Sequence, residues 1–159
     1  MTSISLKTAA HLTGVSKRTI WRRIAAGSLS VSRSEDSRGR TLLSLGDIAG
    51  DIGLPMNSEL IAAIKNADVG QARDQLELAL LFLESGLKVK ALPWLELAAQ
   101  QGDADAMLTL GETQLEVSVE DPKIALNWIR RAAIAGQPLA IAVMEALSSQ
   151  HKRLGNASE

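Results

Sequence analysis

Apolar residues recur at helical spacing in the first part of the chain. The pattern predicts two short helices within residues 5–26, separated by a Gly-Val turn. Ser5 and Ser16 stand at the starts of these helices, where a hydroxyl can accept a hydrogen bond from a free backbone N–H group. In the second helix, Ile20 and Ile24 are one turn apart and therefore share one buried face.

The hydrophobic pattern then changes to the alternation of a β-hairpin. Apolar residues alternate with serine in residues 29–31, a polar segment follows, and residues 41–45 are mostly apolar. Ser44 and Asp47 have the spacing of a capping box, which predicts a short helix over Leu45–Ile52. A glycine and a proline directly after this segment end the helix.

Residues 58–147 consist of helix-forming sequence that repeats. Residues 91–110 align with residues 125–144 at a constant offset, which superimposes a tryptophan, two adjacent alanines and a glycine. The alignment predicts a repeated pair of helices. The matched positions are Ala91 and Ala125, Trp94 and Trp128, Ala98-Ala99 and Ala132-Ala133, and Gly102 and Gly136.

Each repeat is predicted to be a pair of antiparallel helices. Pro93 lies one turn inside one of them and predicts either a kink or a later start. Ser58 is expected to cap a preceding helix over Leu60–Ala67, and a further helix is expected to start at Pro138. The repeated helices are predicted at Gln71–Glu84, Lys88–Gln101, Ala104–Val117 and Pro122–Ala135.

Charge divides the chain into two parts. Residues 1–55 contain eight Lys and Arg against four Asp and Glu, whereas residues 56–159 contain nine against fourteen. The basic part is suited to bind a polyanion, and the acidic part would be repelled by one. The two parts are therefore expected to do different jobs.

The run SLKTAAHLTGVSKRTIWRRIAAGSLSVSR resembles the winged helix-turn-helix domain of excisionase-type and MerR-type DNA-binding proteins. The shared pattern is a short Ala-Ala helix, Gly-Val-Ser, a basic T-I-x-R helix and a basic wing, and it covers about residues 4–53. The resemblance implies that helix 16–26 enters the major groove and that the wing 29–45 touches an adjacent groove or the backbone. Gly46 and Gly50 depart from the family pattern because they weaken the helix after the wing.

This resemblance assigns DNA contact to side chains of the second helix and of the wing. Arginine can bond both acceptors of a guanine edge, whereas lysine mainly anchors phosphate. The alternative is that these residues only solvate a helix face. Trp21 is expected to pack the helix against the wing. The predicted DNA-binding residues are Lys17, Arg18, Thr19, Arg22, Arg23, Arg33, Arg38 and Arg40.

The repeated pattern A-L-x-W-x-x-x-A-A-x-x-G-x-x-x-A resembles the Sel-one-like repeat, a relative of the tetratricopeptide repeat, over about residues 70–147. The resemblance implies an α-solenoid of antiparallel helix pairs whose concave face binds a protein or peptide, with each tryptophan between the helices of its pair. The same spacing suits a helical domain that only dimerises. A protein partner and self-association through residues 58–147, including a homodimer, therefore both stay open.

The composition excludes some kinds of functional site. The chain has no cysteine and two histidines, His11 and His151, so a thiolate zinc site is excluded. No apolar run is long enough to cross a bilayer and the start lacks a secretory signal, so we expect a cytoplasmic protein that contacts no membrane. We expect no enzymatic activity, no cofactor and no metal. Arg33 and Asp36 have the R-x-x-D spacing of some cyclic-dinucleotide sites, although a wing tip is the favoured role.

The expected fold is mainly α with one small β-hairpin: a winged helix-turn-helix domain followed by an α-solenoid. The expected function is regulation of transcription through binding of double-stranded DNA. The alternatives are an adaptor or anti-regulator that acts through protein contacts of the repeats, and an excisionase-like architectural DNA-binding factor. The expected domains are a DNA-binding domain at 1–55, a linker and capping helix at 56–69, helical repeats at 70–148 and a polar tail at 149–159.

Overall fold

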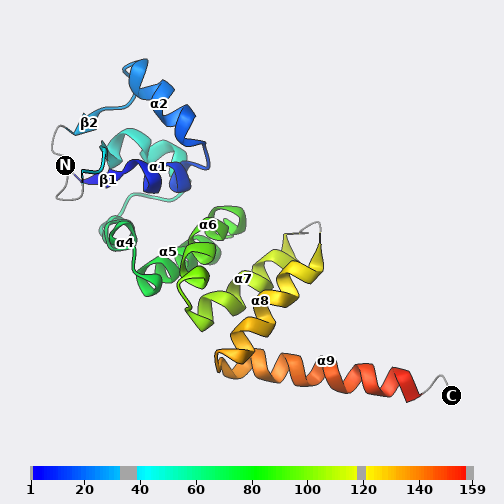
Figure 1. Ribbon diagram of the computed structural model, residues 1–159. Coiled ribbons are helices and arrows are strands. Elements are labelled where there is room, and N and C mark those ends of the chain that lie inside the picture. Colours follow the sequence, from blue (N-terminus) through cyan, green and yellow to red (C-terminus); the bar gives the residue numbers. More distant parts are fainter. Residues whose placement is uncertain (1, 33–38, 118–120, 157–159) are drawn as a thin grey trace. The chain divides into compact units, whose positions relative to one another are not determined.

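The computed structural model describes residues 2–32, 39–117 and 121–156 (Figure 1). The structure is mainly α-helical with one small sheet, as expected from the sequence. The N-terminal third contains short elements only. They are β1 Ser3–Ser5, α1 Leu6–Thr13, α2 Lys17–Ala25, β2 Val31–Ser32, β3 Leu42–Ser44, the 3₁₀ helix η1 Leu45–Ile48 and α3 Ala49–Ile52.

The sheet has three antiparallel strands in the order β1-β3-β2. The sequence predicted the β2–β3 hairpin but not β1, which occupies the three residues before the first helix. Ile4 of β1 lies opposite Leu43 of the central strand, and both side chains are fully buried. Strand β1 therefore contributes to the core that supports α1 and α2. The core of this region is built from Ile4, Leu12, Ile20, Leu43, Leu45, Ile48 and Ile52.

The two N-terminal helices begin where their serines predicted. Ser5 Oγ accepts a hydrogen bond from the backbone N–H of Thr8 at 3.2 Å, and Ser16 Oγ accepts one from Thr19 at 3.2 Å. Gly14 ends α1 in the left-handed region at φ 73°, which glycine adopts without a steric penalty. The tight Gly14 turn sets the entry of α2.

The predicted capping box at the helix after the wing is wrong. Ser44 precedes η1, but its side chain makes no capping hydrogen bond. The Asp47 carboxylate instead accepts a hydrogen bond from the backbone N–H of Ser30 at 2.6 Å, and so ties this segment to the residue before β2. The segment starts as a 3₁₀ helix and becomes α-helical at Ala49.

Six longer helices follow. Helix α4 is capped by Asn57, whose side-chain oxygen accepts a hydrogen bond from the Leu60 N–H at 2.8 Å; the predicted cap Ser58 is the first helical residue. Helix α6 starts at Lys88 despite Pro93, so the later start considered for it does not occur. The helices are α4 Ser58–Val69, α5 Ala72–Glu84, α6 Lys88–Gln100, α7 Ala104–Glu116, α8 Pro122–Ile134 and α9 Pro138–Asn156.

Helix α9 is longer than the other helices and continues through residues that the sequence assigned to a polar tail. No single helix in the described ranges is both long and apolar enough to cross a membrane; only α8 and α9 taken together, across a bend of 119°, reach that length and composition. The chain forms two compact units, which divide between Trp94 and Leu95 inside α6.

The two repeated tryptophans have different surroundings. Trp94 is buried, as the repeat predicted, at 1% exposure. Trp128 is only half-buried, and the guanidinium carbon of Arg131 lies over its ring at 4.2 Å from the centroid. A cation over an aromatic face is attracted by the ring's negative charge distribution. The expected burial of the repeated tryptophans is therefore met by Trp94 and only partly by Trp128.

Helix α7 lies close against α8 at Gly111. A β-carbon at this position would lie 2.6 Å from Ile129 Cγ1 and 2.7 Å from the carbonyl oxygen of Ala125, both on α8. Neither distance is compatible with van der Waals packing, and the second contact is to backbone that cannot move by itself. The absence of a side chain at Gly111 thus permits α7 and α8 to pack.

Replacing Gly111 by alanine is expected to lower the free energy of unfolding by about 1–3 kcal/mol, because the added methyl group overpacks the α7–α8 contact. Urea denaturation followed by circular dichroism measures the change. Gly155→Ala is the matched control, since a β-carbon at Gly155 in α9 meets no atom within 4 Å. Equal stability of the two variants would contradict the close packing at Gly111.

Candidate nucleic-acid interface

One face of α2 carries three cations and a tryptophan. Successive residues of a helix are separated by about 100°, so Lys17, Arg18, Trp21 and Arg22 project from the same side. All four are exposed, with Trp21 at 50%. Ile20 projects from the opposite side and is fully buried. Half of Trp21 therefore faces solvent beside the cations, and its packing against the wing stays a prediction.

Thr19 lies at the edge of this face. Its backbone N–H donates to Ser16 Oγ, and its hydroxyl oxygen lies 3.1 Å from the same Ser16 oxygen. Thr19 is half-buried. The residue therefore stabilises the first turn of α2, and its predicted contact with DNA stays a prediction.

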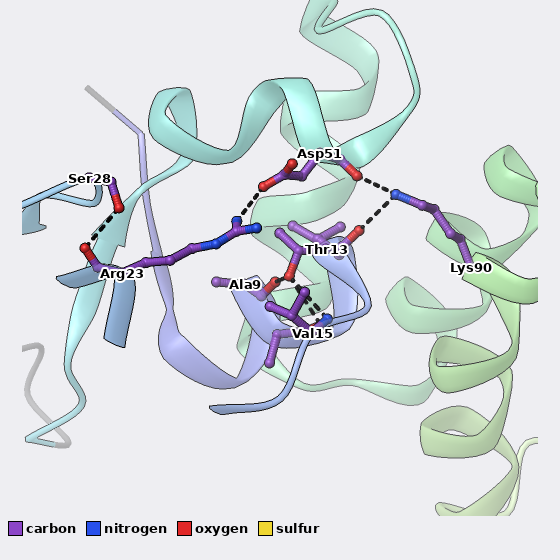
Figure 2. A network of polar contacts seen from close by, with 9 residues as sticks. Ala9, Thr13, Val15, Arg23, Ser28, Asp51 and Lys90 are labelled. Atoms are coloured by element: carbon purple, nitrogen blue, oxygen red, sulfur yellow. Dashed lines mark hydrogen bonds and ion pairs between the residues drawn. The ribbon is translucent and has the colours of Figure 1, made fainter. Parts of the chain in front are cut away.

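Arg23 points away from the exposed face of α2 and contacts α3. One of its guanidinium nitrogens donates to the Asp51 carboxylate at 2.6 Å (Figure 2). Ser28 Oγ donates to the carbonyl oxygen of Arg23, which holds the C-terminal end of α2. Sequence reasoning missed the ion pair because Arg23 and Asp51 are far apart along the chain, and only the fold brings α2 and α3 together.

Arg40 contacts α4. Its guanidinium donates to the backbone oxygen of Asp68 at 3.1 Å and lies 3.7 Å from Asp68 Oδ2. The Asp68 carboxylate also accepts hydrogen bonds from the backbone N–H of Ser5 at 3.1 Å, from Ser5 Oγ at 2.6 Å and from Thr8 Oγ1 at 2.5 Å. We call Asp68 with Ser5, Thr8 and Arg40 the Asp68 cluster. The cluster joins the start of α1 to the end of α4.

Lys90 of α6 makes a second polar connection to the N-terminal elements (Figure 2). Its ammonium group donates to the carbonyl oxygens of Leu12 at 3.3 Å and Ile52 at 2.9 Å, and also to that of Asp51. These carbonyls belong to the last turns of α1 and α3, which have no partner within their own helices. A cation there also interacts favourably with both helix dipoles. Lys90 therefore caps two helices at once.

Two predicted wing residues, Arg33 and Arg38, lie outside the described residues, as does Asp36 of the R-x-x-D pattern. The structure thus places Lys17, Arg18 and Arg22 together on one exposed face. It places Arg23 and Arg40 in contacts with carboxylates of other elements.

The ring of His11 in α1 packs against the ring of Trp94 in α6. The two rings meet edge to face, with centroids 5.5 Å apart and an angle of 85° between their planes. Burial, and secondarily the charges of Lys7 and Lys17, lower the pKa of His11 from its ordinary value. Nδ1 of His11 and Nε1 of Trp94 are buried and have no hydrogen-bond partner among the described residues. The site thus favours the neutral imidazole.

The described parts of the chain contain no group of three or more histidine and acidic residues that could hold a metal ion. Burial raises the pKa of Glu96, and burial together with the charge of Glu116 raises that of Glu112. A groove of about 440 Å³ runs between α4 and α5.

Replacing Asp68 by alanine is expected to lower the free energy of unfolding by about 2–4 kcal/mol, because the change leaves several donors of the Asp68 cluster without an acceptor. Urea denaturation again measures the change. Asp51→Ala is the matched control, since it removes one exposed ion pair, worth about 1 kcal/mol or less. If Asp68→Ala costs no more than Asp51→Ala, the cluster does not hold α1 and α4 together.

The lowered pKa of His11 predicts that the protein loses stability in acid. Its folded pKa is lowered, so the unfolded chain binds a proton more readily, and stability falls as the pH drops through about 6.5. His11→Phe keeps a ring against Trp94 and is expected to reduce this dependence between pH 7.5 and 5.5, as measured by thermal unfolding. His151→Gln, on the exposed end of α9, is the control and should retain the wild-type dependence.

Comparison with known proteins finds a similarity that covers part of the chain. No protein-family model and no solved structure matches the chain. The chain is similar to an F-box protein of Arabidopsis thaliana, with 29% identity over 87 residues. The aligned part covers 55% of this chain and 25% of the F-box protein, so the chain spans about a quarter of that relative.

Proposed function

We propose that this protein is a DNA-binding transcription regulator that reads double-stranded DNA with α2. The observation that carries the proposal is the exposed face of α2, where Lys17, Arg18 and Arg22 surround the half-exposed Trp21. Within the described part of the chain, no carboxylate forms an ion pair with these three cations. Burying them in a folded contact would require counter-charges, which phosphate groups supply.

The geometry of α2 suits a major groove. The helix spans nine residues, about 14 Å, and its N-terminal turn holds Lys17 and Arg18 beside free backbone N–H groups. In helix-turn-helix proteins the N-terminal residues of the second helix contact base edges. Arg18 and Arg22, one turn apart, then follow the groove, while Lys17 contacts phosphate.

Arg23 and Arg40 have a different place in the proposal. Contact with DNA by either residue competes with its ion pair to Asp51 or Asp68. We therefore assign them first to positioning α2 and the start of β3, and DNA contact second. The proposed wing residues Arg33 and Arg38 remain part of the interface as predicted from the sequence.

The helical repeats are proposed to bring a partner or a second copy to the DNA. A domain of this size contacts few base pairs, so binding to two half-sites by a dimer increases specificity. The adaptor alternative acts through protein contacts of the repeats, for which the groove between α4 and α5 offers a surface away from α2. The architectural alternative differs by requiring strong bending of the DNA.

Duplexes selected from a random-sequence pool by the full-length protein provide the test. Arg18→Ala and Arg22→Ala are each expected to weaken binding to a selected duplex about five- to hundredfold, because each removes a guanine contact. Lys17→Ala should weaken all duplexes alike and lower the slope of log affinity against log salt by about 1. Fluorescence anisotropy at several salt concentrations measures both effects.

Arg130→Ala is the matched control, because this exposed arginine lies on α8, where it bonds Asn127. Its affinity should equal that of the wild type. The proposal fails if no duplex is enriched, or if Arg18→Ala and Arg22→Ala bind as Arg130→Ala does. If the protein binds a partner protein but shifts no duplex, the adaptor alternative is favoured. Circular permutation of the binding site within the duplex measures DNA bending, which tests the architectural alternative.

A further inference from the structure

A wedge opens between α8 and α9 in the second unit. The chain turns by 119° between these helices instead of folding back fully, so the two helices diverge from their junction (Figure 1). One hollow of about 260 Å³ lies along α8, and a second of about 540 Å³ lies along α9; Met144 lines both. We call the two hollows together the α8–α9 wedge. Its apolar floor is formed by Leu126 and Ala133 of α8 with Ile141 and Met144 of α9.

The repeat provides an internal standard for how far this floor is covered. At the constant offset of the alignment, Ala133 corresponds to Ala99 and Leu126 to Leu92. Ala99 is fully buried and Leu92 is half-buried, whereas Ala133 is half-buried and Leu126 is 38% exposed. Ile141 on the α9 side of the wedge is also 38% exposed. The second repeat therefore leaves apolar surface open where the first repeat covers it, and clustered apolar surface of this kind marks interaction sites.

Cations line the rims of the wedge. Lys123 and Arg130 lie two turns apart on α8, a distance of about 10 Å along the helix, and Lys152 lies on α9. Arg130 bonds the side-chain oxygen of Asn127 at 2.6 Å. No carboxylate forms an ion pair with these three cations in the part of the chain that the structure describes. Glu145 of α9 is the one carboxylate among the described residues that line the wedge, so the rims carry a net positive charge.

This charge selects an acidic occupant. A segment that covers the floor encloses Lys123 and Arg130 as well, and an enclosed cation without a counter-charge is costly. The occupant must therefore place carboxylates along the α8 rim, and it gains least from a carboxylate opposite Glu145. Nucleic acid also carries negative charge, but interfaces with it are more polar than interfaces between proteins. The aliphatic floor thus favours a protein segment.

The backbone of the occupant is expected to be helical. Neither α8 nor α9 has a strand edge, so an extended segment on the apolar floor would leave its own N–H and C=O groups unpaired. A helix bonds these groups internally and presents apolar side chains along one stripe. The occupant that fits the wedge is therefore an amphipathic helix with an acidic flank.

A second copy of this chain does not offer such a helix from either of its acidic helices, α5 and α7. The long apolar side chains of α7 are buried except for Leu115. Helix α5 exposes Leu80 between Glu77 and Glu84, but these residues line a hollow against α4. Two hollows cannot fill each other. The occupant therefore belongs to a different protein.

We propose that the α8–α9 wedge binds an acidic amphipathic helix of another protein. The apolar stripe of this helix lies on the floor of the wedge, and carboxylates two turns apart on its flank contact Lys123 and Arg130. A further carboxylate contacts Lys152. The inference deepens the proposed function by naming the partner surface of the repeats and its chemistry, and it rests on that function only for the role of bringing this partner to DNA.

Two synthetic helical peptides of about 14 residues, or about 21 Å, test the contact with the full-length protein. Both carry leucines along one stripe; the flanking positions are glutamate in one peptide and lysine in the other. Fluorescence anisotropy is expected to show that the glutamate peptide binds at least about tenfold more tightly. Lys123→Glu with Arg130→Glu should reverse this preference, and a misfolded protein could not show that gain. Glu145→Gln should strengthen binding of the glutamate peptide about two- to fivefold, because it removes a repelling carboxylate.

Lys65→Glu with Arg153→Glu is the matched control, since these exposed cations do not line the wedge, and it should keep the wild-type preference. Amide NMR spectra should show that the glutamate peptide shifts signals of residues 121–156. The inference is overturned if the wild type binds both peptides alike, if the charge reversal leaves the preference unchanged, or if the shifts fall elsewhere. It is also overturned if the peptide only dissociates a self-associated protein, which assigns the wedge to a second copy, or if duplex DNA displaces the peptide, which assigns it to nucleic acid.

The peptide and the duplex separate this inference from the proposed function. Arg18→Ala with Arg22→Ala should abolish specific DNA binding and leave the affinity for the glutamate peptide unchanged. If the protein binds duplexes as predicted but does not distinguish the two peptides, only the wedge proposal fails. If the peptides follow the charge reversals but no duplex is bound, only the proposed function fails.

Discussion

The Asp68 carboxylate is the polar contact that joins α4 to the start of α1, the helix directly before the candidate interface on α2. It accepts hydrogen bonds from the Ser5 backbone, the Ser5 hydroxyl and the Thr8 hydroxyl, and it lies beside the guanidinium of Arg40. Ser5 is also the N-cap of α1, so one carboxylate orients the cap itself. The side chain of Asp68 is only 10% exposed, and a charge in that position is tolerated because its lone pairs are satisfied by several donors. Together with Lys90, it attaches the short N-terminal elements to α4 and α6 through directed polar contacts.

These contacts divide the basic residues into two sets with different roles. Arg23, Arg40 and Lys90 bond groups on neighbouring elements, and they add polar contacts around the small N-terminal core. Lys17, Arg18 and Arg22 remain on the exposed face of α2. The N-terminal elements form a small core, which apolar burial alone stabilises only weakly, so the polar contacts of the first set add to its stability. The exposed set can then bind a polyanion.

The repeat shows how far sequence periodicity predicts packing. Three of the recurring alanines, Ala98, Ala99 and Ala132, are fully buried, and Gly111, which lies outside the aligned positions, has no room for a side chain against α8. The repeat did not predict the different burial of Trp94 and Trp128, because burial depends on neighbouring elements that differ between the two positions. It also did not predict that α9 continues as a helix to Asn156, since polar residues at a chain end are compatible with either a helix or a frayed tail.

The sequence by itself determined the elements that depend on local chemistry: the serine caps, the glycine turn after α1, the basic face of α2 and the repeated helix pairs. These follow from residues within one or two turns of each other. Only the tertiary structure decided which cations remain exposed, because the carboxylates that engage Arg23 and Arg40 are 28 residues away in the chain. Strand β1 was likewise decided by pairing with β3, a contact between distant segments. Periodicity shows which face of an element is apolar, whereas the partner of each polar group depends on which elements pack against each other.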